Sequence, residues 1–444
     1  MKNRTLSGCL RSFAILIVIC LIGKLVYDRI EARLQQSAID RELELARNSN
    51  IPTTWQEFAT SIPTAAESEN SARYYRDLRH HWDLPASAFE SEISIIFDSK
   101  SEQLGALKDI LAKESHSLSL LEKATVLPRC WFKRDWAKGA AVLLPEYADM
   151  KAGAKLLALC GSVEVASNNP GGALRDIHKV FVIAKHSNEE ETTIATLVSE
   201  SIYLIGVRRI ALWSYTHPSI PAYQTALEQA IKNWPKVNLS RMHRDELLMV
   251  RSVLELSTTA KGLADLGIKS ENIAPAERFA PLIFSRRKAD VEIARSTRKI
   301  IEACSLPVQN RLPIIQNEWE NLQRSLLAYP TGGDIYQKLA SGSLTNSDNL
   351  YHDQIWEARR LSYVALARAL KRHPIAEQET FSDIINPLDH KPLVMKKAGK
   401  QIVIELNSSL QTEEKKLGIY LPSDSEMKAL VRSAPKGGAK SGTR

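Results

Sequence analysis

The side chains that could support catalysis or bind a metal are few, and their spacing does not assemble a site. His80 and His81 are adjacent, so on a helix they point to different faces, whereas two ligands of one metal are better placed at i and i+4. Residues 285–288 spell S-x-x-K but lack the companion motifs of penicillin-binding enzymes. The sequence has no H-E-x-x-H, G-x-S-x-G or phosphate-binding glycine loop. We therefore predict no catalytic residue, no metal ligand and no cofactor.

Four charged residues on one predicted amphipathic helix form the polar group of greatest interest. They are Arg241, Arg244, Glu246 and Arg251. An ion-pair network between packed helices is the favoured interpretation, because such networks are common without any function. Ligand binding by the same residues is the alternative.

Three cysteines lie beyond the N-terminal region, at Cys130, Cys160 and Cys304. They are far apart and show no C-x-x-C spacing, so no zinc site is predicted. Three cysteines can form one disulfide at most. Burial as small apolar residues is the favoured interpretation.

A long apolar run near the N-terminus determines the predicted topology. Residues 13–27 read FAILIVICLIGKLVY, and residues 13–23 carry no charge. A bilayer-spanning helix needs about 20 mostly apolar residues, and the charges of Arg11 and Lys24 can reach the headgroups from its ends. The predicted anchor residues are Phe13, Ile15, Leu16, Ile17, Val18, Ile19, Leu21, Ile22, Leu25, Val26 and Tyr27.

The residues around this run predict its orientation. Lys2, Arg4 and Arg11 precede it without any acidic residue, which places the N-terminus in the cytoplasm and exports the remainder. A cleaved signal peptide is the main alternative, although the region around Ala32 offers only a poor cleavage site. A lipoprotein signal is disfavoured because the apolar run follows Cys9, whereas it should precede the cysteine. A buried core helix is disfavoured because the run lies at the N-terminus and is flanked by basic residues.

The net charge of +8 is concentrated at the two ends of the chain. Four basic residues and no acidic ones precede residue 25, and five basic residues and no acidic ones follow Glu426, so residues 25–427 carry a net charge of −1. The N-terminal charges serve membrane orientation, and a basic C-terminal end is usually a solvated tail. We therefore expect no nucleic-acid partner.

Helical periodicity dominates the exported part. Helices are predicted at residues 28–47, 55–62, 70–82, 85–98, 101–113, 115–124, 147–167, 173–186, 189–215, 219–233, 239–266, 285–304 and 351–372. The pair 147–167 and 173–186, joined by Asn-Asn-Pro-Gly-Gly, has the dimensions of a tetratricopeptide-like hairpin of ~34 residues. The acidic run 189–191 is expected to open the next helix. Residues 305–350 show no clear pattern.

These features predict a mainly α protein with an N-terminal transmembrane helix, a body of antiparallel helical hairpins and a small C-terminal β-hairpin. The β-hairpin is expected at residues 392–406, where PLVMK and QIVIEL flank residues 397–400. The predicted organisation is a basic cytoplasmic tip at 1–12, the anchor at 13–27, a juxtamembrane stalk helix at 28–50, a helical exported body at 51–372, the hairpin segment at 373–422 and a disordered basic tail at 423–444.

Several stretches resemble a group of uncharacterised bacterial proteins that combine an N-terminal membrane helix with a helical, tetratricopeptide-like exported body. The matching stretches are residues 70–76, 169–215, 241–254, 351–374 and 381–405. The last of these is similar to a pseudopilin-like D-P-x-x-G-x-P-L segment, with Asn386 before Pro387 where aspartate is usual and Met395 in place of an aromatic residue. The resemblance implies the architecture and carries no assigned activity.

An anchor, a helical body and the lack of a catalytic motif favour a scaffold or protein-interaction module. Its expected location is the bacterial inner membrane, with the body in the periplasm. The expected partners are the lipid bilayer and another envelope protein. An envelope enzyme with a site assembled from distant helices is one alternative. An accessory role in a secretion or pilus-like system, which rests on the C-terminal resemblance, is another.

Overall fold

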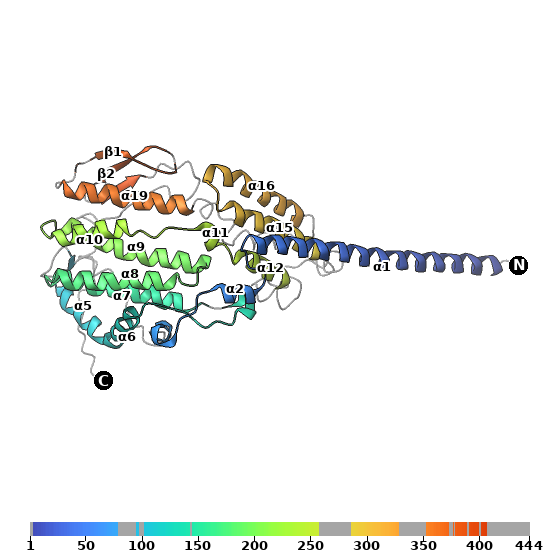
Figure 1. Ribbon diagram of the computed structural model, residues 1–444, viewed down its shortest axis with the longest axis horizontal. Helices are drawn as coiled ribbons and strands as arrows, with labels where there is room; N and C mark the ends of the chain where they lie inside the picture. The colour runs from blue at the N-terminus through green and yellow to red at the C-terminus, as the bar shows by residue number, and fades with distance from the viewer. Residues whose placement is uncertain are drawn as a thin grey trace, which may run out of the picture. The chain divides into compact units, whose positions relative to one another are not determined.

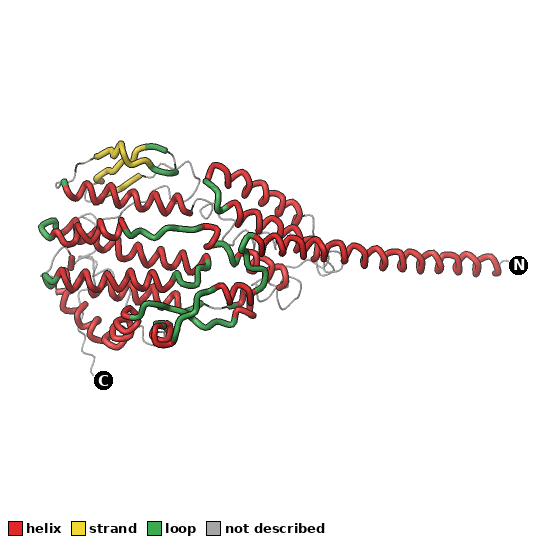
Figure 2. Tube along the Cα trace, viewed as in Figure 1, coloured by secondary structure: helices red, strands yellow, loops and turns green. Residues whose placement is uncertain are grey.

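The structure, a computed structural model, describes residues 3–78, 95–96, 102–142, 144–256, 286–327, 352–372, 376, 378–388, 390–398 and 401–405. This part is mainly helical, with a small antiparallel sheet (Figures 1 and 2). The chain divides into two compact units. The first unit is Met1–Phe58, Ala137–Ala140 and Arg244–Asn346, and the second is Ala59–Trp136, Ala141–His243 and Ser347–Arg444. The boundaries predicted from the sequence stay predictions, and the tail at 423–444 lies outside the described residues.

The first unit contains the long helix α1 (Asn3–Asn48). It also holds the helices α12 (Glu246–Leu256), α15 (Arg286–Ala303) and α16 (Val308–Leu327), and the start of α2 (Trp55–Ser61). Large apolar side chains of α1 are exposed at Ile22, Val26, Tyr27, Ile30 and Leu34, and Ile39, Glu42 and Ala46 are buried. Among the residues described, no helix combines the length and hydropathy that a bilayer crossing requires.

The buried end of α1 packs against α15. The small core of this contact consists of Ala46, Ile51, Leu247, Ala294 and Ile301. Arg295 Nε and Arg298 Nη2 donate hydrogen bonds to the Glu42 carboxylate over 3.0 and 2.9 Å. Burial alone would raise the pKa of Glu42, but the hydrogen bonds and charges of the two arginines outweigh it and lower the pKa. An ionised Glu42 therefore helps hold α1 against α15.

Helix α16 was missed by the sequence pattern, because prolines interrupt the stretch. Pro307 precedes the helix and Pro313 lies inside it, near the first turn. A proline there removes one intrahelical hydrogen bond, and packing against α15 offsets that loss. Glu318 of α16 accepts hydrogen bonds from Lys299 Nζ at 2.7 Å and Ser296 Oγ at 3.2 Å.

The second unit is a stack of helices completed by a small sheet. Its helices are α3 (Ala72–Leu78), α5 (Glu102–Lys113), α6 (Ser115–Val126), α7 (Glu146–Ala166), α8 (Pro170–Ser187), α9 (Thr193–Thr216), α10 (Pro221–Lys232), α11 (Leu239–Met242) and α19 (His352–Lys371). Two short 3-10 helices are η1 (Glu67–Glu69) and η2 (Trp136–Ala141), and residues 137–140 of η2 belong to the first unit. Helices α7, α8 and α9 lie side by side, and short turns join them in alternating directions (Figure 1).

The turn between α7 and α8 follows from its residues. Asn168 adopts a left-handed φ of 58°, which asparagine tolerates better than most residues. The side chain of Asn169 accepts a hydrogen bond from the Gly172 backbone N–H at 3.1 Å and caps α8. Pro170 occupies the first helical position, where its missing N–H costs nothing. The predicted pair of helices is thus confirmed.

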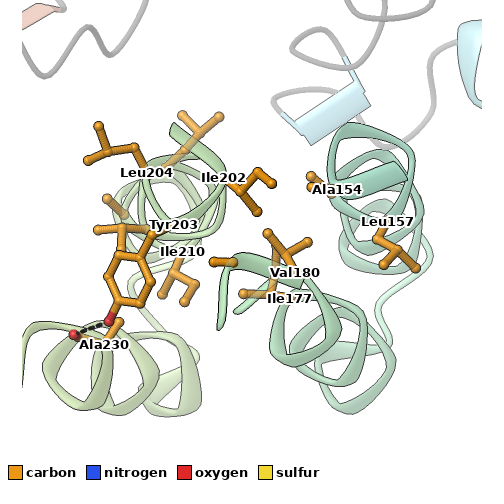
Figure 3. Close-up of a cluster of buried hydrophobic side chains, with 14 of the residues drawn as sticks. Ala154, Leu157, Ile177, Val180, Ile202, Tyr203, Leu204, Ile210 and Ala230 are labelled. Atoms are coloured by element: carbon orange, nitrogen blue, oxygen red, sulfur yellow. Dashed lines mark hydrogen bonds between the residues drawn. The ribbon is translucent and has the colours of Figure 1, made fainter. Parts of the chain in front are cut away.

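Helix α9 is the centre of the core. Its apolar side chains pack against α7, α8 and α10, and Ile202, Tyr203 and Ile210 are buried (Figure 3). Gly206 permits the close approach of α9 to α8, since a Cβ at this position would come within 2.6 Å of Cε1 of Phe181. The hydroxyl of Tyr203 donates to the Ala230 carbonyl at 2.6 Å and ties α9 to α10.

The acidic run before α9 does not open the helix, contrary to the prediction. Thr192 is the N-cap, and its side chain accepts a hydrogen bond from the Ala195 backbone N–H at 3.1 Å. Glu191 has a φ of 52°, which is incompatible with the first turn of an α-helix. Residues 189–191 therefore form the connection from α8.

The helix predicted at residues 239–266 is interrupted, and the structure describes it only as far as residue 256. Helix α11 ends at Met242, and α12 begins at Glu246. The Met242 carbonyl accepts a hydrogen bond from Thr193 Oγ1 at 3.0 Å. This tertiary hydrogen bond satisfies a carbonyl at the helix end, so the chain can leave the helix there.

The sheet contains β1 (Gln378–Ile385), β2 (Pro392–Ala398) and β3 (Gln401–Glu405), antiparallel and in that order. The predicted hairpin corresponds to β2 and β3. Met395 pairs with Ile404 in β3 and with Glu379 in β1, the strand that the sequence pattern left unassigned. The sheet packs on α19, and Phe381 is buried in the same core.

Candidate functional site

An open groove in the second unit is lined by α8, α9 and α10 and has a volume of about 790 Å³. Its apolar lining comprises Leu174, Ile177, Phe181, Ala184, Tyr203, Ile210, Ala226, Ala230 and Pro235. The lining runs along α8 from Leu174 to Lys185, roughly 16 Å at 1.5 Å per residue. That length fits three helical turns or about five extended residues.

An aromatic pair forms the middle of the groove. The ring centroids of Phe181 and Tyr203 are 4.8 Å apart, and the rings are tilted by 41°. Burial raises the pKa of Tyr203, so its hydroxyl stays protonated and remains a donor to the Ala230 carbonyl. In Figure 3 this side chain extends from α9 toward Ala230 on α10. The hydrogen bond fixes the ring in place, which makes the groove a preformed surface.

One end of the groove is polar. Asn188, Glu189 and Glu191 line it where α8 stops. Arg129 Nε donates to Glu189 Oε2 at 2.9 Å, and Arg241 pairs with Glu191. The side chain of Glu189 is only 10% exposed, and its Oε1 is buried without a hydrogen-bond partner.

Between these two acids, Glu190 points into the core instead. Its carboxylate accepts hydrogen bonds from Arg134 Nε and from the Tyr147 hydroxyl, both at 2.6 Å. Arg134 also contacts Glu146 at 3.1 Å, and its side chain is 4% exposed. Burial raises the pKa of Glu190, and Glu190 in turn raises the pKa of Arg134 against the opposite effect of burial. This buried pair holds the α8–α9 connection, and hence the polar end of the groove.

A buried histidine near the C-terminal end of α8 connects this helix to α3 through hydrogen bonds. His186 Nε2 lies 3.0 Å from the Leu127 carbonyl, which can only accept, so Nε2 carries the proton. His186 Nδ1 therefore accepts from the Tyr75 hydroxyl at 2.9 Å. Burial lowers the pKa of His186 to about 4, and the charge of Lys185 adds to this effect, whereas the hydrogen bond to the Leu127 carbonyl opposes it.

Cys130 interacts with Ser71, which also contacts His186, but it is not an activated nucleophile. It is 1% exposed, and burial raises the pKa of its thiol to about 12. A thiol rather than a thiolate is therefore present at neutral pH. Across the described ranges, no three His, Cys, Asp or Glu side chains gather where they could hold a metal ion. His80, His81 and Ser285 lie outside those ranges.

The four charged residues singled out from the sequence fall in different units. Arg241 pairs with Glu191 in the second unit. In the first unit, Arg251 forms two hydrogen bonds with Asp290, at 2.7 and 2.9 Å. The guanidinium carbon of Arg244 lies 5.3 Å from the ring centre of Phe58. Glu246 begins α12 and is buried. A single network joining all four stays a prediction.

The predicted anchor residues are described only in part. Ile22, Val26 and Tyr27 are exposed, at 56%, 53% and 64%. The side chains of the other anchor residues named above lie outside the described set. The anchor itself stays a prediction.

Sequence reasoning missed the groove, although it identified the helix that forms one wall. The spacing of Leu174, Ile177, Phe181 and Ala184 predicts an apolar face on α8. The packing of α10 determines which part of this face is covered and which part stays open as a groove. A local sequence pattern does not predict how α10 packs. Comparison with protein-family models, curated proteins and solved structures finds no match to this chain.

Proposed function

We propose that the protein is a membrane-anchored interaction module of the bacterial envelope that binds a segment of another envelope protein in the groove of the second unit. The observation that carries the proposal is the groove itself, with an apolar lining and a polar end. Apolar grooves with a few placed polar groups are the usual form of binding sites. Antiparallel helical hairpins typically present such a surface to other proteins.

The proposal places residues 13–27 in the inner membrane, with the N-terminus in the cytoplasm and the body in the periplasm. Its support is the apolar run with basic residues before it. A second support is the exposure of Ile22, Val26 and Tyr27 on α1, more than ten residues before the buried Ile39. Exposed apolar side chains of this size are stable in contact with lipid.

The groove is tested by site-specific photocrosslinking in living cells. A benzoylphenylalanine at Gln229, which is exposed and lines the groove, is expected to crosslink to one segment of one envelope protein, mapped by mass spectrometry. Lys232, exposed on the same helix outside the groove lining, provides the matched control position. Ala226→Trp should fill the groove and remove most of the crosslink. Equal crosslinks at both positions, or a crosslink that survives the filled groove, would contradict the proposal.

The anchor is tested by topology. Full-length protein should stay in the membrane fraction after alkaline extraction, and protease added to spheroplasts should digest the body. Replacing residues 1–27 with a cleavable signal peptide should release an intact body into the soluble periplasm. A mature N-terminus near Arg33, or a body protected from protease in spheroplasts, would overturn this part of the proposal.

A further inference from the structure

The polar end of the groove contains an acceptor that the chain itself leaves open. Glu189 has a side chain that is nine-tenths buried, and Arg129 uses only its Nε to reach Oε2. The other oxygen, Oε1, is buried and has no hydrogen-bond partner. A buried carboxylate oxygen without a donor lowers the stability of the folded protein, and a bound donor would recover that loss.

The groove can present this oxygen to a ligand. Glu189 is among the residues that line it, so a donor bound at the polar end of the groove lies beside this carboxylate. Glu189 and Glu191 line the polar end and pair with Arg129 and Arg241, and a carboxylate oxygen such as Oε1 forms its strongest hydrogen bonds with charged donors. The ligand group favoured here is therefore a cationic donor.

The remainder of the lining specifies what must accompany this donor. Leu174, Ile177, Phe181 and Tyr203 offer an apolar surface to one side of the polar end. A ligand that fills both parts carries apolar side chains over about three helical turns and a cation at one end. Arginine fits better than lysine, because a guanidinium is more weakly hydrated than an ammonium group and loses less on reaching a buried oxygen.

We infer that the groove selects an amphipathic segment of a partner protein in which apolar residues are followed at one end by an arginine, whose guanidinium donates to Glu189 Oε1. This inference rests on the proposed function and identifies the chemical class of its ligand. The contact selects both the charge of the bound segment and its orientation in the groove. The orientation is fixed because the arginine must lie at the C-terminal end of α8, next to Glu189.

The test uses full-length protein in detergent and a set of designed peptides of three helical turns. All share one apolar stripe, with arginine at either end or with the neutral isostere citrulline at the same place. Fluorescence anisotropy gives their Kd. One arginine peptide should bind about tenfold or more tightly than its citrulline counterpart, as expected for a hydrogen bond between charged groups.

Variants of the carboxylate and its neighbour complete the test. Glu189→Gln should bring the arginine-to-citrulline ratio close to one, while citrulline peptides still bind. Arg129→Met frees the second oxygen and should keep or increase the ratio, which a merely structural role of Glu189 would not do. Glu320→Gln on α16, an exposed glutamate far from the groove in sequence, is the matched control. Thermal unfolding checks that each variant is folded.

The outcomes separate the two proposals. Arginine and citrulline peptides that bind equally, with no change in Glu189→Gln, would overturn the inference and leave the groove as a binding site. Failure of every peptide to bind wild-type protein, with no effect of Ala226→Trp on the crosslink at Gln229, would overturn the proposed function together with the inference.

Discussion

Replacing Glu190 by alanine is expected to lower the free energy of unfolding by about 3 kcal/mol, the lower end of the range for breaking a buried ion pair. The change leaves the guanidinium of Arg134, which is 4% exposed, without its nearest carboxylate. Arginine does not lose its proton in proteins, so the buried positive charge remains without its partner. Glu146 at 3.1 Å compensates part of the charge, which is why the lower end is expected. Urea denaturation of the full-length protein measures the effect.

Three further variants show whether the charge is responsible. Glu190→Gln keeps the shape and some hydrogen bonds, so it should cost less than alanine. The double change Arg134→Met with Glu190→Leu removes both charges and should recover much of the loss. Glu357→Ala removes a carboxylate from a half-exposed pair with Arg360 and should cost less than about 1 kcal/mol. Equal losses for Glu190→Ala and Glu357→Ala would contradict this interpretation.

The contribution of His186 to the free energy of unfolding is also expected to fall by about 3 kcal/mol as the pH drops from neutral to about 4. The unfolded chain takes up a proton on this histidine near pH 6.5, whereas the folded protein does so only near pH 4, since burial lowers the pKa. Between these values the unfolded state binds more protons, so acid favours unfolding. Denaturation across this pH range gives the slope.

The contribution of His186 to the pH dependence of stability is obtained by comparing wild-type protein with a variant that lacks this histidine. Burial raises the pKa of Glu190, which favours the folded state in acid and opposes the histidine. His186→Gln can still accept from Tyr75 and donate to the Leu127 carbonyl, and it should flatten the curve between pH 6.5 and 4 relative to wild type. His178→Gln, which removes an exposed histidine from the same helix, is the control. Curves for wild type and His186→Gln that run parallel would rule the explanation out.

Local patterns predicted the parts of the fold that local physics determines. The pair α7 and α8 follows from helical periodicity and from the residues of its turn, with Asn169 as cap and Pro170 at the first helical position. The hairpin of β2 and β3 follows from two apolar stretches around a glycine. The interruption before α12 depends on a hydrogen bond from Thr193, 49 residues from Met242, and no local pattern contains that information.

The same limit applies to the candidate site. Residues 189–191 are three identical acids in sequence, yet Glu190 faces the core and its neighbours line the groove. The difference comes from Arg134, which lies 56 residues earlier in the chain and draws Glu190 inward. The charge of the run by itself predicts the start of a helix, because acidic residues are favoured in the first turn.

The position of the Phe181 ring in the groove wall depends on Gly206, which lies outside the groove lining. Phe181 forms part of its wall, and the ring can lie where it does because Gly206 offers no side chain on the opposite side. A larger residue at Gly206 would displace the Phe181 ring, so the shape of the groove can be changed from a position outside its lining. The specificity proposed for the groove can thus change by repacking the contact between α8 and α9, while the residues that line the groove stay the same.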